Sequence, residues 1–184
     1  KKIFYKNPLD IINKLKIDIL FEAIGNSDGI SKKIVENSLI VYTGAQRKSN
    51  LIEKDKIKKI KSNYSYFKEM FQIATEAKNI IQKNSQSDFL DICKLMRENW
   101  KLKRKLSKLV SSNYIDNIYN FSVKNGAIAG KLLGAGGGGF LYLLTKNKKD
   151  KKNLKNKLKN LNIIDCKPEE KGTHIVFKDR SDFY

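Results

Sequence analysis

Residues 130–140 read Gly-Lys-Leu-Leu-Gly-Ala-Gly-Gly-Gly-Gly-Phe, and this stretch decides the fold. Five of the six residues from Gly134 to Gly139 are glycine. Glycine loses more conformational freedom on folding than any other residue and has no side chain to pack. A glycine run between two apolar segments therefore indicates backbone that comes close to a ligand, with successive N–H groups that can bind an anion. A flexible hairpin without a ligand is the alternative interpretation.

Three known glycine-loop patterns do not fit this stretch. Gly134, Gly136 and Gly139 have the spacing of the dinucleotide-binding motif, but that motif must open a helix, and the apolar run 140–144 predicts a strand. A Walker A loop requires Gly-Lys-Ser/Thr at its end, which is absent here. A protein kinase needs a downstream His-Arg-Asp segment, and the one histidine of this sequence is His174.

The elements around the loop predict an α+β fold. Strands are expected at Ala127–Leu133 and Phe140–Thr145, followed by a lysine-rich helix at Lys148–Leu161 and a last strand at His174–Phe177. Leu39–Tyr42 predicts an earlier strand, and helices fill the space after it. The order of strand, helices, strand, strand, helix and strand is that of a ferredoxin-like split βαβ core, here with several extra helices in the first crossover.

Apolar residues at steps of three and four predict the crossover helices and are expected to face a core. The first stripe is Phe67, Met70, Phe71, Ala74, Ala77 and Ile81, and the second is Phe89, Cys93, Met96 and Trp100. Ser87 is expected to cap the second helix, and Asn113 and Asp116 the third. Gly126 is placed to end that third helix.

The N-terminal part is less regular. Ile3–Tyr5 suggests a short strand, and Asn7-Pro8 could open a helix, with Asn as the cap and Pro at the first helical position. We treat residues 1–38 as an N-terminal segment, one interpretation being the end of a truncated N-terminal domain, and residues 39–184 as the main domain. No apolar run is long enough to span a membrane, and Cys93 and Cys166 have no metal-type spacing, so a cytoplasmic protein is expected.

The formal net charge of +19 raises the question of nucleic-acid binding. Only four of the basic residues are arginine, the residue that pairs best with phosphates and base edges. The lysines are also spread over the whole chain. We therefore expect a positively charged surface without specific nucleic-acid binding, and no membrane association.

The glycine stretch, with its lysine and its two flanking strands, resembles the third, C-terminal motif of the GHMP kinases. Val41-Tyr42-Thr43-Gly44 followed by Arg47 is similar to the heptose-phosphate kinase branch of that family, as are the helical segments 98–101 and 112–119. The resemblance covers roughly residues 39–178. It implies the C-terminal domain of an ATP-dependent sugar or sugar-phosphate kinase, with heptose phosphate as the expected acceptor.

The resemblance also implies where the site lies. Substrate or phosphate binding is expected at Gly134, Ala135, Gly136, Gly137, Gly138, Gly139, Lys131 and Arg47. For Lys131 a solvated lysine is the alternative, and for Arg47 a surface salt bridge. The family carries its ATP phosphate loop in an N-terminal GHMP domain, and no such segment occurs in these 184 residues. We therefore expect no catalytic residue and no metal ligand in this chain, which alone should be inactive. ATP and Mg²⁺ are expected only in the full-length enzyme, with that domain in cis.

Two other functions remain open at this point. One is a non-catalytic ferredoxin-like module that binds nucleic acid through its positive charge. The other is a domain that binds a small-molecule regulator. The glycine loop with Lys131 favours the kinase domain over the first alternative, because Tyr and Phe residues take core-type spacings instead of forming an exposed row on a sheet face.

Overall fold

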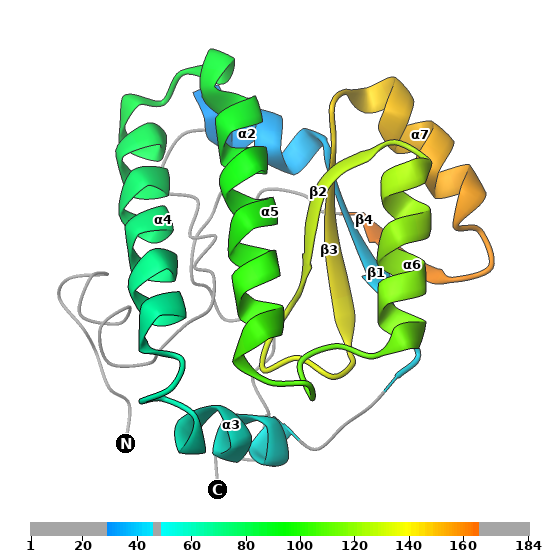
Figure 1. Ribbon diagram of the computed structural model, residues 1–184. Coiled ribbons are helices and arrows are strands. Elements are labelled where there is room, and N and C mark those ends of the chain that lie inside the picture. The colour runs from blue at the N-terminus through cyan, green and yellow to red at the C-terminus, as the bar shows by residue number, and fades with distance from the viewer. Residues whose placement is uncertain (1–28, 46–48, 166–184) are drawn as a thin grey trace, which may run out of the picture.

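The computed structural model describes residues 29–45 and 49–165, which build an antiparallel sheet with helices around it (Figure 1). The sheet has four strands in the order β2-β3-β1-β4. Their bounds are β1 Ser38–Tyr42, β2 Ala127–Leu132, β3 Phe140–Thr145 and β4 Asn162–Asp165. All neighbours pair antiparallel. This is the strand order of a ferredoxin-like core, so the predicted α+β fold is confirmed.

Most of the helical residues lie in the crossover from β1 to β2. The helices are α2 Gly29–Glu36, α3 Ser49–Lys58, α4 Tyr64–Lys83, α5 Phe89–Leu106, α6 Asn113–Lys124 and α7 Lys148–Lys157, with a short 3₁₀ turn at Gln86–Asp88 before α5. β2 and β3 are joined directly by the glycine loop, and α7 connects β3 to β4.

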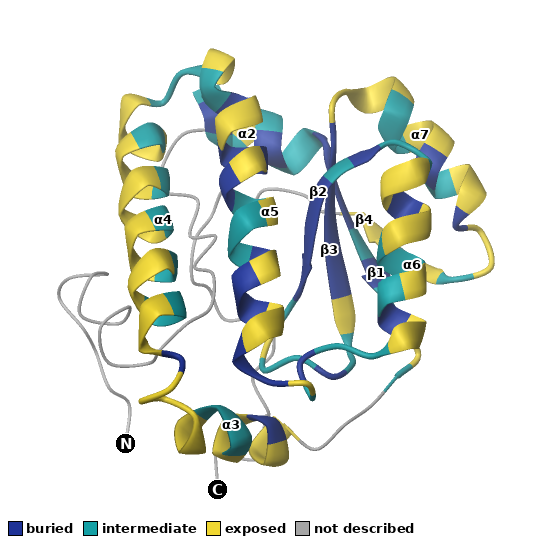
Figure 2. Cartoon of the chain, viewed as in Figure 1, coloured by how far each residue is buried: buried dark blue, intermediate teal, exposed yellow. Residues whose placement is uncertain are grey.

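The two faces of the sheet are covered by different helices. Leu39, Val41 and Leu141 pack on one face with residues of α6 and α7, for example Ile115 and Leu154. Successive residues of a strand point to opposite faces, so Tyr142 and Leu144 join a second cluster. That second cluster includes Ile30 and Ile34 of α2 and Phe89, Ile92 and Cys93 of α5. Figure 2 shows β2, β3 and the side of α5 that faces them as mostly buried.

Helix α5 lies beside β2 and contributes to both clusters, since Trp100 packs in the first and Phe89 in the second. The guanidinium of Arg97 donates to the Ile128 carbonyl at 3.0 Å. Side chains of α5 thus contact the main chain of β2 as well as its side chains. Because α5 runs along β2, its C-terminal end lies beside the glycine loop.

The predicted core stripe of α4 is only partly correct. No residue of α4 is buried, and Phe71 and Ile81 are 73% and 39% exposed. The partly buried row is Phe67, Met70, Ile73, Ala77 and Ile80, so Phe71, Ala74 and Ile81 were assigned to the wrong side. Among the described residues α4 packs mainly on α5, as Figure 2 shows, and one neighbour covers only a narrow strip of a helix.

Two predicted helix caps are displaced. Ser85, not Ser87, accepts a hydrogen bond at the turn before α5, and no side chain caps α5 itself. Ser112, not Asn113, caps α6 by accepting from the Ile115 N–H. Asp116 is likewise not a cap.

Asp116 lies in the first turn of α6, where it accepts hydrogen bonds from Ser111 and Arg104 at 2.7 and 2.9 Å. At the other end of the helix, Gly126 follows the C-cap with φ of 113°, as a terminating glycine should.

The last elements were also placed differently. α7 ends at Lys157 instead of Leu161, and β4, which was not predicted, begins at Asn162 after a turn of four residues. β4 shows little of the period-two burial of a strand, because only Ile163 is partly buried. The predicted strand His174–Phe177 and the elements at Ile3–Tyr5 and Asn7-Pro8 lie outside the described residues.

The predicted boundary between residues 38 and 39 remains a prediction, although α2, on its N-terminal side, places Ile30 and Ile34 in the core. Within residues 29–45 and 49–165, no helix combines the length and the apolar character needed to cross a membrane.

Candidate functional site

The connection from β2 to β3 is built from glycines in backbone conformations that other residues avoid. Gly134, Gly136, Gly137 and Gly139 have φ of 67°, 110°, 75° and 87°. Such positive φ values put the Cβ of an L-residue in conflict with its own backbone. Gly136 has a second constraint, because a Cβ there would lie 2.7 Å from the Val110 carbonyl oxygen. The glycine run is therefore required by the shape of the loop itself.

The end of the loop is fixed to the end of β1. The Gly139 carbonyl accepts from both the backbone N–H and the Oγ1 hydroxyl of Thr43, at 2.9 and 2.8 Å. The Gly139 N–H donates to the Ala45 carbonyl at 2.8 Å. Thr43 is fully buried. These bonds bring the Thr43-Gly44 segment, which resembles a motif of the heptose-phosphate kinase branch, against the glycine loop.

The middle of the loop is fixed to the segment that follows α5. The Gly137 N–H donates to the Val110 carbonyl at 2.8 Å, and the Leu133 N–H donates to the Phe140 carbonyl at 2.8 Å at the base of the hairpin. By contrast, the N–H groups of Gly134, Ala135, Gly136 and Gly138 have no hydrogen-bond partner among the described residues. Several free backbone N–H groups in a glycine turn are what anion-binding loops offer.

Two buried lysines border this loop. Lys131 on β2 is 4% exposed, and Lys103 on α5 is 2% exposed. The Lys103 ammonium donates to the Gly134 carbonyl at 2.5 Å. Lys131 lies opposite Tyr142 in the strand register and is not the solvated surface lysine that the sequence left open. Lysine is rarely this buried without partners for its charge, and both of these lysines have such interactions.

Lys103 was missed in the sequence, although a signal existed. It lies three residues after Trp100, on the apolar stripe of α5, where a lysine interrupts the pattern. A charged residue at a core position of a helix indicates a specific partner. That partner is a main-chain carbonyl 31 residues further along the chain.

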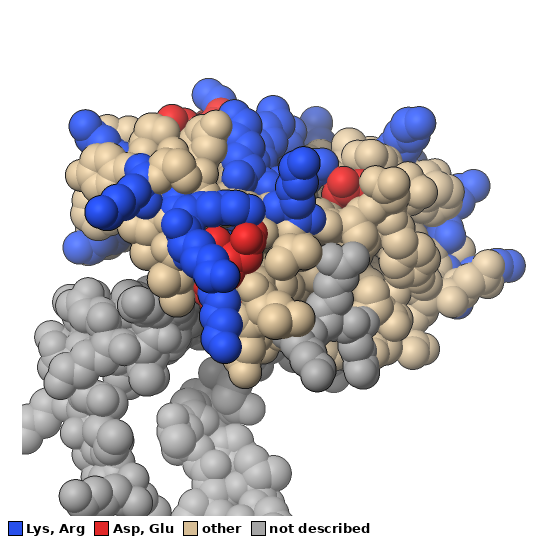
Figure 3. All heavy atoms as spheres, turned by 60° about the horizontal axis from the view of Figure 1, so that its bottom comes forward, with Lys and Arg blue, Asp and Glu red and all other residues tan. Residues whose placement is uncertain are grey.

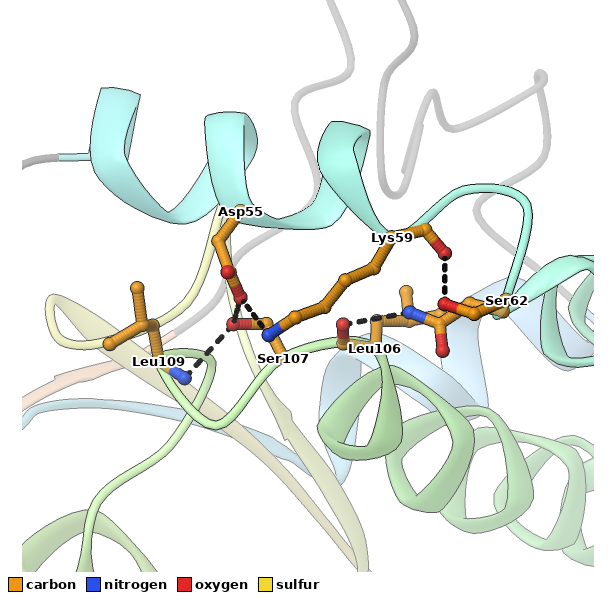
Figure 4. Close-up of polar contacts among 7 residues, drawn as sticks. Asp55, Lys59, Ser62, Leu106, Ser107 and Leu109 are labelled. Carbon is orange, nitrogen blue, oxygen red and sulfur yellow. Dashed lines mark hydrogen bonds and ion pairs between the residues drawn. The ribbon is translucent and has the colours of Figure 1, made fainter.

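A brace formed by α3 supports the segment that holds the loop (Figure 4). The Asp55 carboxylate accepts from Lys59 at 2.7 Å and from the Ser107 hydroxyl. The Ser107 oxygen in turn accepts from the Leu109 N–H at 3.0 Å. Hydrogen bonding to Lys59 and then to Ser107 lowers the pKa of Asp55. The brace orders the turn that presents the Val110 carbonyl to the glycine loop.

The same end of the molecule is positively charged. Figure 3 shows Lys and Arg side chains gathered around a few acidic ones on the face formed by the bottom of Figure 1, where α3 lies. α3 and the turn after it carry exposed Lys54, Lys58, Lys59 and Lys61, and Lys105 and Lys108 are also exposed. Such a surface attracts anions and speeds their arrival.

Other candidate residues take structural roles or lie elsewhere. Arg47 lies outside the described residues, so its role remains a prediction. The Cys93 thiol is buried in the core, and burial raises its pKa to about 12, which leaves it unreactive. Within the described part of the chain no cluster of His, Cys, Asp and Glu could hold a metal ion.

Two surface hollows of the described chain lie away from the loop. One, of about 450 Å³, lies between α2 and the start of α7 and is lined by residues such as Lys33 and Lys146. The other, of about 440 Å³, lies between α6 and the end of α7 and is lined by residues such as Tyr114 and Leu158.

Comparison with known proteins agrees with this geometry. Residues 76–164 match the family model described as the C-terminal domain of GHMP kinases. The chain is 28% identical over 139 residues to the D-glycero-alpha-D-manno-heptose 7-phosphate kinase of Campylobacter jejuni, covering 76% of this chain and 38% of that protein. It is 26% identical over 149 residues to the bifunctional fucokinase/GDP-fucose pyrophosphorylase of Arabidopsis thaliana, covering 77% of this chain and 13% of that protein.

Among solved structures, the mevalonate kinase of Methanococcus jannaschii superposes with a TM-score of 0.58 at 28% identity, covering 75% of this chain and 41% of that one. The chain therefore spans well under half the length of the relatives it matches. The fold, the glycine hairpin and the family match agree on the kind of domain. Residues 76–164 of this chain match the C-terminal domain of GHMP kinases, in agreement with the resemblance of the glycine motif.

Proposed function

We propose that this domain forms the acceptor side of an ATP-dependent kinase that phosphorylates a sugar or a sugar phosphate. The observation that carries the proposal is the glycine hairpin, whose backbone is fixed at Gly137 and Gly139 while the other four N–H groups of residues 134–139 have no partner within the described chain. Donors fixed in place before the ligand arrives stabilise the charge of a phosphoryl group without a reorganisation cost.

A heptose phosphate is the acceptor that we favour. The Campylobacter relative is named as a heptose 7-phosphate kinase, and its similarity extends over three quarters of this chain. The exposed lysines around α3 support a substrate that carries its own phosphate, because they favour anions over neutral sugars.

The proposal also includes ATP and Mg²⁺, which would bind mainly to an N-terminal GHMP domain. Phosphoryl transfer depends on positioning and on cations that neutralise the transferred group. This chain contributes a backbone loop and buried lysines, and an N-terminal GHMP domain in cis would contribute the nucleotide loop. Any ATP and Mg²⁺ would then bind mainly to that domain, near the face that carries the glycine hairpin.

The test uses the complete polypeptide that contains these residues and measures ADP release with Mg-ATP. Heptose 7-phosphate should be a better acceptor than the same sugar without phosphate, fucose or mevalonate. If mevalonate were the one acceptor of these four compounds to give ADP release, the proposed sugar specificity would be rejected. If none of the four compounds gave ADP release, the acceptor proposal itself would be rejected. The 184-residue chain should give only background, and turnover of about 1 s⁻¹ or more by this chain alone would contradict the assignment of ATP to another domain.

A further inference from the structure

Lys103 is a buried cation, and one of its partners is a main-chain oxygen of the glycine hairpin. The side chain is 2% exposed, and its ammonium lies 2.5 Å from the Gly134 carbonyl. Burying an ammonium group is costly unless its charge is compensated. The neighbouring positions Leu102 and Leu106 are buried apolar residues, so a leucine or methionine at position 103 would suit the helix equally well. The lysine therefore needs an explanation beyond packing.

The geometry of the peptide bond supplies one. The carbonyl of Gly134 and the N–H of Ala135 belong to one planar trans peptide, so they point in opposite directions. Because the Lys103 ammonium holds the carbonyl toward α5, the Ala135 N–H must point away from α5. This N–H is one of the four in residues 134–139 that lack a partner in the described chain.

Other peptides of the loop are fixed by uncharged groups, at Gly137 and at Gly139. The Val110 carbonyl fixes the N–H of Gly137, and Thr43 fixes the carbonyl of Gly139. The first peptide of the glycine run is instead held by a cation. A cation at that point has two effects, since it orients the peptide and also adds positive potential beside the N–H groups that remain free.

We propose that Lys103 is a positioning residue for phosphate binding: it orients the 134–135 peptide so that its N–H faces a phosphoryl group, and its charge strengthens the hold of the loop on that anion. This inference rests on the proposed function in assuming that the ligand of the hairpin is a phosphate. It assigns to α5 a direct part in the site, in addition to its part in the core.

The test is a titration of the full 184-residue chain with inorganic pyrophosphate, followed through the backbone N–H resonances of residues 134–139. The Ala135, Gly136 and Gly138 resonances should shift saturably. Lys103→Met should weaken binding at least tenfold, and Lys103→Arg, which keeps the charge, should recover most of the loss. Lys101→Met is the matched control, because Lys101 is an exposed lysine of the same helix, and it should stay within about twofold of the wild type.

Thermal unfolding of each variant separates positioning from stability. Gly134 is exposed, so water can solvate its carbonyl when the lysine is removed, and the variant should fold. If Lys103→Met does not fold, Lys103→Gln is measured, and a loss of at least threefold is expected because the charge is absent. Wild-type affinity in a folded variant without the charge would overturn the inference, and so would wild-type loop resonances that do not shift. The kinase proposal is tested separately, by ADP release from the complete polypeptide, so failure of the Lys103 inference would leave that proposal standing.

Discussion

The loop of the glycine hairpin and helix α4 differ both in regularity and in how firmly the rest of the fold holds them. The loop has no regular secondary structure, yet Thr43, Val110 and Lys103 each hold one of its peptides. Helix α4 is a regular helix of 20 residues, yet none of its residues is buried. Hydrogen bonds inside a helix satisfy its backbone but do not fix its place in the fold, whereas long-range contacts do. The candidate site is built from the constrained region.

The largest expected difference between well-packed and exposed regions concerns two phenylalanines. Phe89, at the start of α5, is 1% exposed, and Phe71 of α4 is 73% exposed. Phe89→Ala should lower the free energy of unfolding by about 3–5 kcal/mol, because it leaves a cavity in the core. Phe71→Ala should change it by no more than about 0.5 kcal/mol. Urea unfolding measures both, and a loss above about 2 kcal/mol at Phe71 would mean that α4 is covered in solution.

A second pair sharpens the account of the hairpin itself. Gly134 and Gly136 both have positive φ, but a Cβ meets the Val110 carbonyl only at Gly136, while at Gly134 it meets nothing within 4 Å. Gly134→Ala should cost about 1–2 kcal/mol from backbone conformation alone. Gly136→Ala should cost about 1–3 kcal/mol more, since the backbone must shift to relieve the contact. Equal losses in thermal unfolding would show that the approach of Val110 relaxes at no cost.

The effect of Gly137→Val should appear in activity more than in stability. Gly137 has φ of 75° and donates to Val110, so a β-branched side chain would move the free N–H groups beside it. In the complete polypeptide we expect kcat/KM to fall by about 10²-fold, a loss typical of misplaced groups at a reacting centre. Unchanged kinetics in a folded variant would make the hairpin a spacer.

The brace under the hairpin should make stability depend on pH. The pKa of Asp55 is lowered in the folded protein, so its contribution is fully present above the ordinary value of about 3.9. It is lost as the pH falls through the lower folded pKa. Asp55→Asn should flatten this part of the curve of unfolding free energy against pH. Urea unfolding of both proteins at several pH values measures the difference.

The smallest expected effect concerns the positive charge of the exposed regions. Exposed lysines such as Lys68 and Lys78 of α4 can release counterions from nucleic acid, whereas buried Lys103 cannot reach it. Binding to any DNA or RNA at 150 mM salt should be no tighter than about 10⁻⁴ to 10⁻⁶ M, and Lys103→Met should not change it. A nanomolar, sequence-selective complex would favour the nucleic-acid module instead.

The sequence predicted the parts of the fold that local chemistry determines. β3 was predicted residue for residue and β1 within one residue, because apolar β-prone runs bounded by glycine leave little choice. The exposed side of α4 could not be predicted, since the periodicity of a helix shows that a stripe exists but not how much of it a neighbour covers. The caps at Ser85 and Ser112 differ from the predictions by one or two residues, the usual uncertainty of helix ends.

For the candidate site, the sequence singled out the glycine loop, and the positive φ values explain why glycine is needed there. The binding role of these residues remains a prediction. The role of Lys103 depends on a carbonyl 31 residues away, and burial of Lys131 depends on how β2 meets its surroundings. Neither can be derived from spacing along the chain.

The three hydrogen bonds between Gly139 and the end of β1 also have a consequence for the order of folding. They join residues almost a hundred positions apart, since Thr43 and Gly139 are separated by 96 residues. Strands β2 and β3 can pair locally within microseconds, as hairpins do. Closing the much longer segment that leads back to β1 costs more chain entropy and must wait for the crossover helices to pack. The β2–β3 hairpin is therefore expected to form before its loop is joined to the end of β1.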